Sequence, residues 1–156
     1  MRIKYIFLAC LFLLPFRSYA ESVLPADVFA KIQAAANIQP GEVVYVDFWA
    51  SWCNPCRKSF PWMNAMHQKY QSKGFKVLAI NVDKERELAD VFLSQISATF
   101  PIFYDPAGDL AKAFQLKGMP SSFVINDKGA ILVAHKGFFE NNVAAYETEI
   151  QSFLTR

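Results

Sequence analysis

The sequence predicts an α/β fold in which a mixed β-sheet is covered by helices. Apolar runs of strand length alternate with segments of helical composition through most of the chain, a pattern typical of β-α-β units. Near the end of the chain, two strands joined by a turn precede a last helix, which adds an antiparallel hairpin to the sheet. The sequence contains no repeat, low-complexity tract or Gly/Ser linker, so we expect one domain.

The first half of this domain contains two predicted helices and two predicted strands. Residues 26–36 have helical composition and end before a Pro-Gly pair. The run 42–49 is rich in β-branched and aromatic residues and predicts a buried central strand. Residues 56–72 form the second predicted helix, and 76–82 the second buried strand.

The second half continues the alternation and then closes with the hairpin. An amphipathic helix is predicted over 84–97 and a short strand over 101–104. The remaining predicted elements are a short helix over 108–115, strands over 122–125 and 130–134 joined by the turn Asn126-Asp127-Lys128-Gly129, and a helix over 139–154.

The first 20 residues have the pattern of a secretory signal peptide. A basic start is followed by an apolar run over 6–14 and by Ser18-Tyr19-Ala20, an A-x-A-like cleavage site. The apolar run is shorter than the roughly 20 residues of a membrane span. We therefore expect a signal peptide over 1–20, a domain over 21–156 and export to a bacterial periplasm. An uncleaved N-terminal anchor and lipid attachment at Cys10 are the alternatives.

Composition excludes two broad classes of protein. Hydrophobic residues make up 53% of the 156 residues and aromatic residues 15%, which excludes a disordered chain. Cleavage after Ala20 would remove three of the 16 Lys and Arg residues, leaving 13 against 14 Asp and Glu. A near-neutral mature chain provides no electrostatic basis for binding nucleic acid.

Cys53 and Cys56 are the two cysteines that remain after such cleavage, and their spacing indicates chemistry. A disulfide between residues three apart closes too short a loop to stabilise a fold much, so an exported chain would use this pair in reactions. A strand precedes the pair and a helix follows it, which places Cys53 at a helix N-terminus, where unpaired N–H groups favour a thiolate. We expect Cys53 to be the exposed nucleophile and Cys56, one turn deeper, to be the resolving thiol.

Asp47 lies in the otherwise apolar strand before the cysteines. If its side chain is buried, its raised pKa would suit a base that takes the proton of Cys56. The alternative is an edge strand on which Asp47 points to solvent.

The run from Val46 to Cys56 resembles the thioredoxin signature V-D-F-W-A-x-W-C-x-P-C, and Pro61 lies where thioredoxins carry a helix-kinking proline. Lys117-Gly118-Met119-Pro120 resembles the segment of that superfamily whose proline is cis. The exported TlpA/ResA-like branch is most similar, because Thr99-Phe100-Pro101 and Asp105-Pro106-Ala107-Gly108 match its F-P…D-x-x-G pattern. Two departures are Asp47, where many members of that branch have Asn, and Asn54-Pro55 between the cysteines.

This resemblance implies a thioredoxin fold with a helix–strand insertion between Val82 and Asp109. It also implies a thiol–disulfide oxidoreductase acting on protein disulfides, without cofactor or metal. Substrate contacts would come from Trp52, Asn54, Pro55, Met119 and Pro120, and structural support from Trp49 and Pro61. Packing alone would equally explain both tryptophans, and a trans turn proline is the alternative for Pro120. By the same resemblance we expect a monomeric reductant that serves cytochrome c maturation or client cysteines and has a membrane electron donor.

Two other functions fit the sequence less well. A peroxiredoxin needs a P-x-x-x-T-x-x-C context, which Cys53 lacks, and a copper carrier of this fold would have C-x-x-x-C with a distal His. A disulfide oxidant or isomerase stays open, because the redox potential is not readable from the residues. His67 is too far from the thiols to activate them, His135 indicates no metal site, and the charge run 83–87 is interpreted as a solvated helix start.

Overall fold

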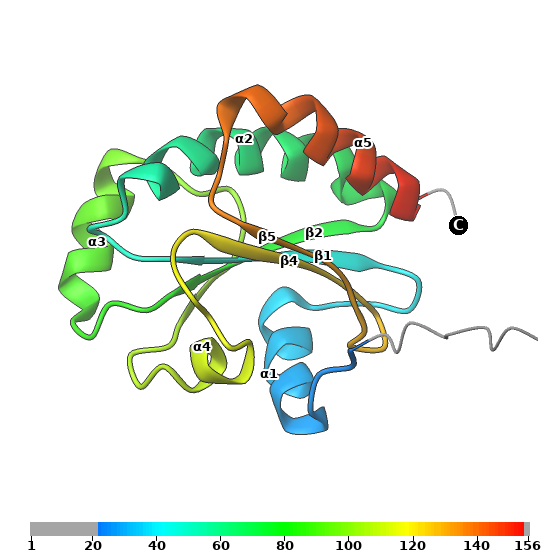
Figure 1. Ribbon diagram of the computed structural model, residues 1–156, viewed down its shortest axis with the longest axis horizontal. Coiled ribbons are helices and arrows are strands. Elements are labelled where there is room, and N and C mark those ends of the chain that lie inside the picture. The colour runs from blue at the N-terminus through cyan, green and yellow to red at the C-terminus, as the bar shows by residue number, and fades with distance from the viewer. Residues whose placement is uncertain (1–21, 155–156) are drawn as a thin grey trace, which may run out of the picture.

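The computed structural model describes residues 22–154, which form a five-stranded mixed sheet between two layers of helices (Figure 1). The strand order is β3-β2-β1-β4-β5, with β1, β2 and β3 parallel and with β4 and β5 antiparallel to their neighbours. The helices are α1 (Ala26–Ala36), α2 (Asn54–Tyr70), α3 (Arg86–Gln95), α4 (Asp109–Ala113) and α5 (Val143–Leu154), and the strands are β1 (Val43–Trp49), β2 (Phe75–Asn81), β3 (Ile102–Tyr104), β4 (Ser121–Asn126) and β5 (Ile131–Lys136). Short 3-10 turns cover Gln71–Lys73 and Glu140–Asn142.

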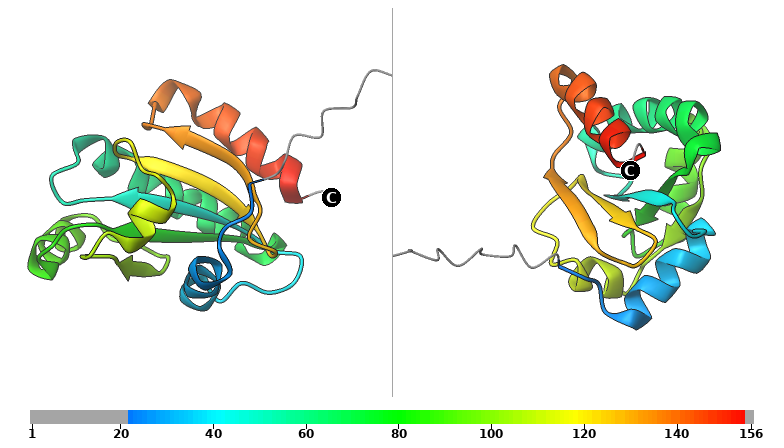
Figure 2. Two further views of the ribbon diagram at one scale, coloured as in Figure 1. Left: turned by 60° about the horizontal axis from the view of Figure 1, so that its bottom comes forward. Right: turned by 90° about the vertical axis from the view of Figure 1, so that its right-hand side faces the viewer.

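The central strand β1 is buried along its whole length and divides the core in two. Its odd-numbered apolar residues, Val43, Tyr45 and Trp49, pack with α2, α3 and α5 on one face of the sheet. Its even-numbered residues, Val44, Val46 and Phe48, pack with α1 and α4 on the other. Figure 2 shows the sheet between these two layers. This alternation is the two-residue period of a strand, and it places Asp47 on the α2 face.

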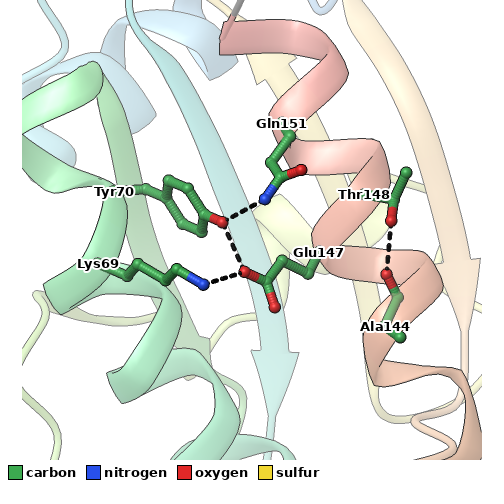
Figure 3. A network of polar contacts seen from close by, with 6 residues as sticks. All are labelled: Lys69, Tyr70, Ala144, Glu147, Thr148 and Gln151. Carbon is green, nitrogen blue, oxygen red and sulfur yellow. Dashed lines mark hydrogen bonds and ion pairs between the residues drawn. The ribbon is translucent and has the colours of Figure 1, made fainter.

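Polar contacts between helices tie α5 to α2 (Figure 3). The Tyr70 hydroxyl donates a hydrogen bond to Glu147 at 2.5 Å and accepts one from Gln151 at 2.6 Å. Lys69 forms an ion pair with the same Glu147 oxygen at 2.6 Å. These contacts hold α5 in place over the hairpin side of the sheet.

The predicted order of elements is confirmed, including the helix and strand between β2 and α4. Three helices are shorter than predicted. The backbone leaves the helical region at Ile96 after α3 and at Gln115, whose φ is 52°, after α4, and the 3-10 turn Glu140–Asn142 takes the place of the predicted start of α5. The hairpin turn has Gly129 at φ 79°, and an added Cβ there would lie 2.9 Å from Cγ of Phe29. The predicted signal peptide falls outside the described residues. Within 22–154, no helix is both long and apolar enough to cross a membrane.

Candidate active site around the Cys53–Cys56 disulfide

Cys53 and Cys56 form a disulfide at the N-terminus of α2, with an S–S distance of 2.02 Å and Cα atoms 5.3 Å apart. Cys53 is the N-cap residue, and its sulfur accepts a hydrogen bond from the Cys56 backbone N–H at 3.3 Å. Pro55 lies in the first helical turn, where a missing N–H removes no helical hydrogen bond. A sulfur at this position faces unpaired N–H groups and the positive end of the helix dipole, which stabilise a thiolate.

The burial of the two cysteines differs from the sequence prediction in one respect. Cys56 is fully buried, as predicted, but Cys53 is only 3% exposed, so the expectation of an exposed sulfur is wrong for this oxidised state. The disulfide turns the Cys53 sulfur toward its partner within the α2 layer of the core. The exposed residues are instead the neighbours of Cys53. Trp52 is 69% exposed, and Asn54 and Pro55 are also exposed.

Asp47 is buried and has no charged partner to offset its burial. Its residue is 1% exposed, and its Oδ2 atom accepts no hydrogen bond. Burial raises the pKa of this carboxyl well above its usual range. Because β1 is the central strand, the alternative of a solvent-facing Asp47 on an edge strand is excluded. Burial thus increases the proton affinity of a carboxyl on the face covered by α2, as a base in this position requires.

The loop before Cys53 is anchored by Asp83, which the sequence analysis assigned to a solvated charge run. Asp83 is only 6% exposed, and it accepts hydrogen bonds from the Ser51 backbone N–H at 2.8 Å and the Ser51 hydroxyl at 2.9 Å. Asn81 donates a further bond to it at 2.8 Å. The interpretation of residues 83–87 as a solvated helix start is therefore wrong for Asp83. The available signal was the position of Asp83 just after β2, a strand parallel to the one that leads into the cysteine loop.

Trp49 and Pro61, for which the resemblance implies structural support, lie at the end of β1 and within α2. Trp49 is fully buried and packs edge-on against Phe60 and at a tilt against Phe92, with ring centroids 5.1 and 4.6 Å away. Its Nε1 atom has no hydrogen-bond partner. Pro61 lies within α2. Packing accounts for Trp49, so the structure assigns it no chemical step.

The Met119–Pro120 peptide bond is cis, as the resemblance implied. It leads directly into β4, whose first residue, Ser121, pairs with Phe48 near the carboxyl end of β1. The cysteine loop leaves β1 at that same end, so the two segments meet there. Met119 is half-buried against the α2 layer of the core.

A groove of about 440 Å³ runs beside the start of α2 and was not foreseen from the sequence. Asn54, Pro55 and Lys58 line one side, and the turn after β5 lines the other with Phe138 and Phe139. Phe139 is 54% exposed. Two adjacent aromatic residues after a glycine were the available signal.

The two basic residues that follow Cys56, Arg57 and Lys58, have partners away from the disulfide. Arg57 lies over the Phe92 ring at 4.7 Å and donates a hydrogen bond to Gln95. Lys58 forms an exposed ion pair with Glu140 at 2.7 Å. At the helix terminus, the Cys56 backbone N–H donates directly to the Cys53 sulfur and so provides positive potential there. Among residues 22–154, no group of three or more His, Cys, Asp or Glu side chains is placed to hold a metal ion.

Several known proteins that are similar to this chain in sequence or structure are named for thiol–disulfide exchange. The chain is 33% identical over 97 residues to the thiol-disulfide oxidoreductase ResA of Bacillus thuringiensis subsp. konkukian, a match that covers 62% of this chain and 56% of that protein. The chain thus spans about half the length of the curated relatives it matches. A crystal structure from Chlorobium tepidum, described as a thiol:disulfide interchange protein DsbE, has 48% identity and a TM-score of 0.71 over 73% of this chain and 81% of that one.

StoA from Bacillus subtilis has 27% identity and a TM-score of 0.61, over 70% of this chain and 84% of that chain. These likenesses agree with the observed sheet and helix layers and identify a thioredoxin fold of the TlpA/ResA-like kind. The family model described as Redoxin matches residues 26–150, which include every strand and the cysteine pair. The chain therefore belongs to the Redoxin family.

Proposed function

We propose that this protein is a thiol–disulfide oxidoreductase that exchanges disulfides with protein partners. The observation that carries the proposal is the Cys53–Cys56 disulfide at the N-terminus of α2, above a buried unpaired carboxyl. The names of the similar proteins support the same reaction class.

In the reducing direction, the Cys53 thiolate attacks a client disulfide and forms an S–S bond to one client sulfur. The other client sulfur leaves as a thiolate and takes a proton from solvent. The Cys56 thiol then gives its proton to Asp47, and the resulting thiolate attacks the Cys53 sulfur. This step forms the Cys53–Cys56 disulfide and releases the second client thiolate, so two electrons pass to the client. The oxidising direction is the reverse.

Client contact is proposed for the exposed rim of the site. Trp52, Asn54 and Pro55 present side chains to solvent next to the disulfide. Half-buried Met119 and buried Pro120 precede β4 at the end of β1 from which the cysteine loop leaves, and we propose that they contact the client there. The apolar groove walls at Phe138 and Phe139 favour a client with an apolar side chain near its reactive cysteine.

The cellular role that we propose is that of an exported reductant. The signal-like pattern of residues 1–20 favours the periplasm, and similarity to ResA favours client cysteines such as those of cytochrome c maturation, with a membrane protein as electron donor. The equilibrium redox potential, measured against glutathione, tests the direction. A potential near −270 mV would support a reductant, and one near −120 mV would contradict it.

The reaction class is tested with cysteine variants in insulin-disulfide reduction. Cys53→Ser should lower the rate to that of buffer alone. Cys56→Ser should accumulate a mixed disulfide with the client, visible on a non-reducing gel. In a chain that keeps residues 1–20, Cys10→Ser removes the third thiol and is the matched control, with an expected parental rate. If Cys56→Ser kept full multiple-turnover activity, the two-thiol mechanism would be wrong.

A further inference from the structure

Three polar side chains occupy directly paired positions on three neighbouring strands. Asp47 on β1 pairs with Ser122 on β4, and Ser122 pairs with His135 on β5. All three lie on the α2 and α5 face, because the Tyr45 hydroxyl reaches Ser122 Oγ at 2.7 Å and His135 Nε2 lies 2.8 Å from a Glu149 oxygen on α5. Side chains at directly paired positions are about 5 Å apart at Cβ. They therefore form a continuous row across the sheet, from its centre to α5.

The row extends from Asp47 in only one direction. On the opposite side, Asp47 pairs with Ala79 of β2, which has no polar side-chain atom. Along β1, the residues on the same face are Tyr45 and Trp49, and Trp49 is part of the aromatic cluster. Among the cross-strand neighbours of Asp47, Ser122 is therefore the one that can exchange a proton.

Exposure rises steadily along the row. Asp47 is 1% and Ser122 3% exposed, whereas the side chains of His135 and Glu149 are 20% and 32% exposed. The row thus connects a buried carboxyl to the solvent at the edge of α5.

The hydrogen-bonding groups of the row are arranged for transfer. Ser122 accepts its hydrogen bond from Tyr45, so its own hydroxyl proton remains to be donated. The two groups that flank it, Asp47 Oδ2 and His135 Nδ1, are both buried and have no hydrogen-bond partner. Ser122 makes no direct hydrogen bond to either group, so a change of side-chain rotamer or a bridging water is needed to join them. Imidazole can take a proton on one nitrogen and release one from the other.

We propose that Ser122 and His135 form the path by which the proton that Asp47 takes from Cys56 leaves the interior. This inference rests on the proposed role of Asp47 as the base. In each oxidation, Asp47 passes its proton to Ser122 while Ser122 passes its own to His135 Nδ1, and the proton on Nε2 leaves to solvent past Glu149. Asp47 is then ionised again, His135 is neutral again, and one proton has been released. In the reducing half-cycle, the same path returns a proton to Cys56.

The titratable groups around the row come from each element packed against it. Asp47 and Tyr45 face it from β1, Cys56 lies on α2 above this face, and Tyr146 and Glu149 face it from α5. Burial raises the pKa of Tyr45 well above its usual range, so its hydroxyl stays protonated. Tyr45 therefore holds Ser122 in place, and His135 supplies the imidazole of the row, whose two nitrogens can take up and release protons.

The experiment separates attack from resolution with DTNB, an aromatic disulfide, added to the reduced Cys10→Ser protein. Release of the first thionitrobenzoate reports attack by Cys53, and release of the second reports resolution by Cys56. Ser122→Ala and His135→Gln should leave the first phase unchanged and slow the second about tenfold in dilute buffer. Added imidazole should restore the resolution rate of His135→Gln, and the pH dependence of that rate should differ from the parental one. His67→Gln, which changes the other half-buried histidine, is the matched control with an expected parental rate.

The outcomes distinguish this path from the functions on which it rests. Slow resolution in Asp47→Asn with parental resolution in both Ser122→Ala and His135→Gln would overturn the path and leave the base in place. Slowing without imidazole rescue or a changed pH profile would also overturn it, since a structural defect predicts that result. A parental resolution rate in Asp47→Asn would contradict the role of Asp47 as the base for Cys56. DTNB exchange that survives Cys53→Ser would contradict the proposed function.

Discussion

The two faces of the sheet are built from the same strands but differ in how completely their polar groups are satisfied. On the α1 and α4 face, β1 contributes Val44, Val46 and Phe48, all with no measurable exposure and surrounded by apolar side chains. On the α2 and α5 face, alternate residues of the same strand include Tyr45 and Asp47.

The four buried side-chain N or O atoms without a partner in the described part of the chain all lie on the α2 and α5 side. They belong to Asp47, Trp49, His67 and His135. An unsatisfied buried polar group destabilises a fold by about 1–3 kcal/mol. Both faces contain a hydrophobic cluster, but the α2 and α5 face also holds buried polar groups that weaken its contribution to stability and are available for chemistry.

The largest expected effect on stability comes from a cavity on the α1 and α4 face of the sheet. Ile32→Ala removes a fully buried side chain of α1 and should lower the free energy of unfolding by about 3 kcal/mol. Urea unfolding measures the loss, and the DTNB resolution rate of the folded protein should stay parental. Ile150→Ala is the matched cavity beneath α5 and should also change that rate, because α5 carries Glu149 and Tyr146. Equal effects of both variants on resolution would contradict the division between the faces.

Asp47→Asn should raise the free energy of unfolding rather than lower it, because the substitution removes a carboxyl whose charged form is disfavoured by burial. The pKa of Asp47 is raised on folding, so the folded protein holds its proton at pH values where the unfolded chain has released it. Parental stability should therefore fall as pH rises from the usual carboxyl pKa to the raised one. The variant should lack this fall and be more stable by about 1–3 kcal/mol at alkaline pH. Urea unfolding of the oxidised proteins at pH 4 and pH 8 tests this, and a gain of equal size at both would refute it.

The smallest expected effect concerns the tie between α2 and α5, far from the cysteines. Tyr70→Phe removes the hydroxyl that contacts Glu147 and Gln151 and should lower the free energy of unfolding by about 1 kcal/mol. Thermal unfolding measures the loss. The DTNB phases should be unchanged, so a resolution defect as large as that of His135→Gln would show that α5 acts through its position rather than through its proton-transfer groups.

Local pattern was sufficient for the features that lie within one segment. The order of elements followed from apolar periodicity and turn residues, and the active pair followed from Cys53 and Cys56 at the start of a helix. Asp47 stood out because a carboxyl interrupts an apolar strand. Each of these signals lies within a few residues of the structure it predicts, so the sequence by itself determined them.

Tertiary structure alone decided which distant residues meet. The anchor between Ser51 and Asp83 joins loops at the ends of two parallel strands, and the row from Asp47 through Ser122 to His135 depends on strand order and register. No local pattern encodes which strands become neighbours, and a shift of one residue in register would turn Ser122 to the opposite face. The burial of Cys53 was likewise set by the layer of α2 and its neighbours around the disulfide. Side-chain chemistry was thus readable along the chain, whereas its connection across the sheet was decided by pairing.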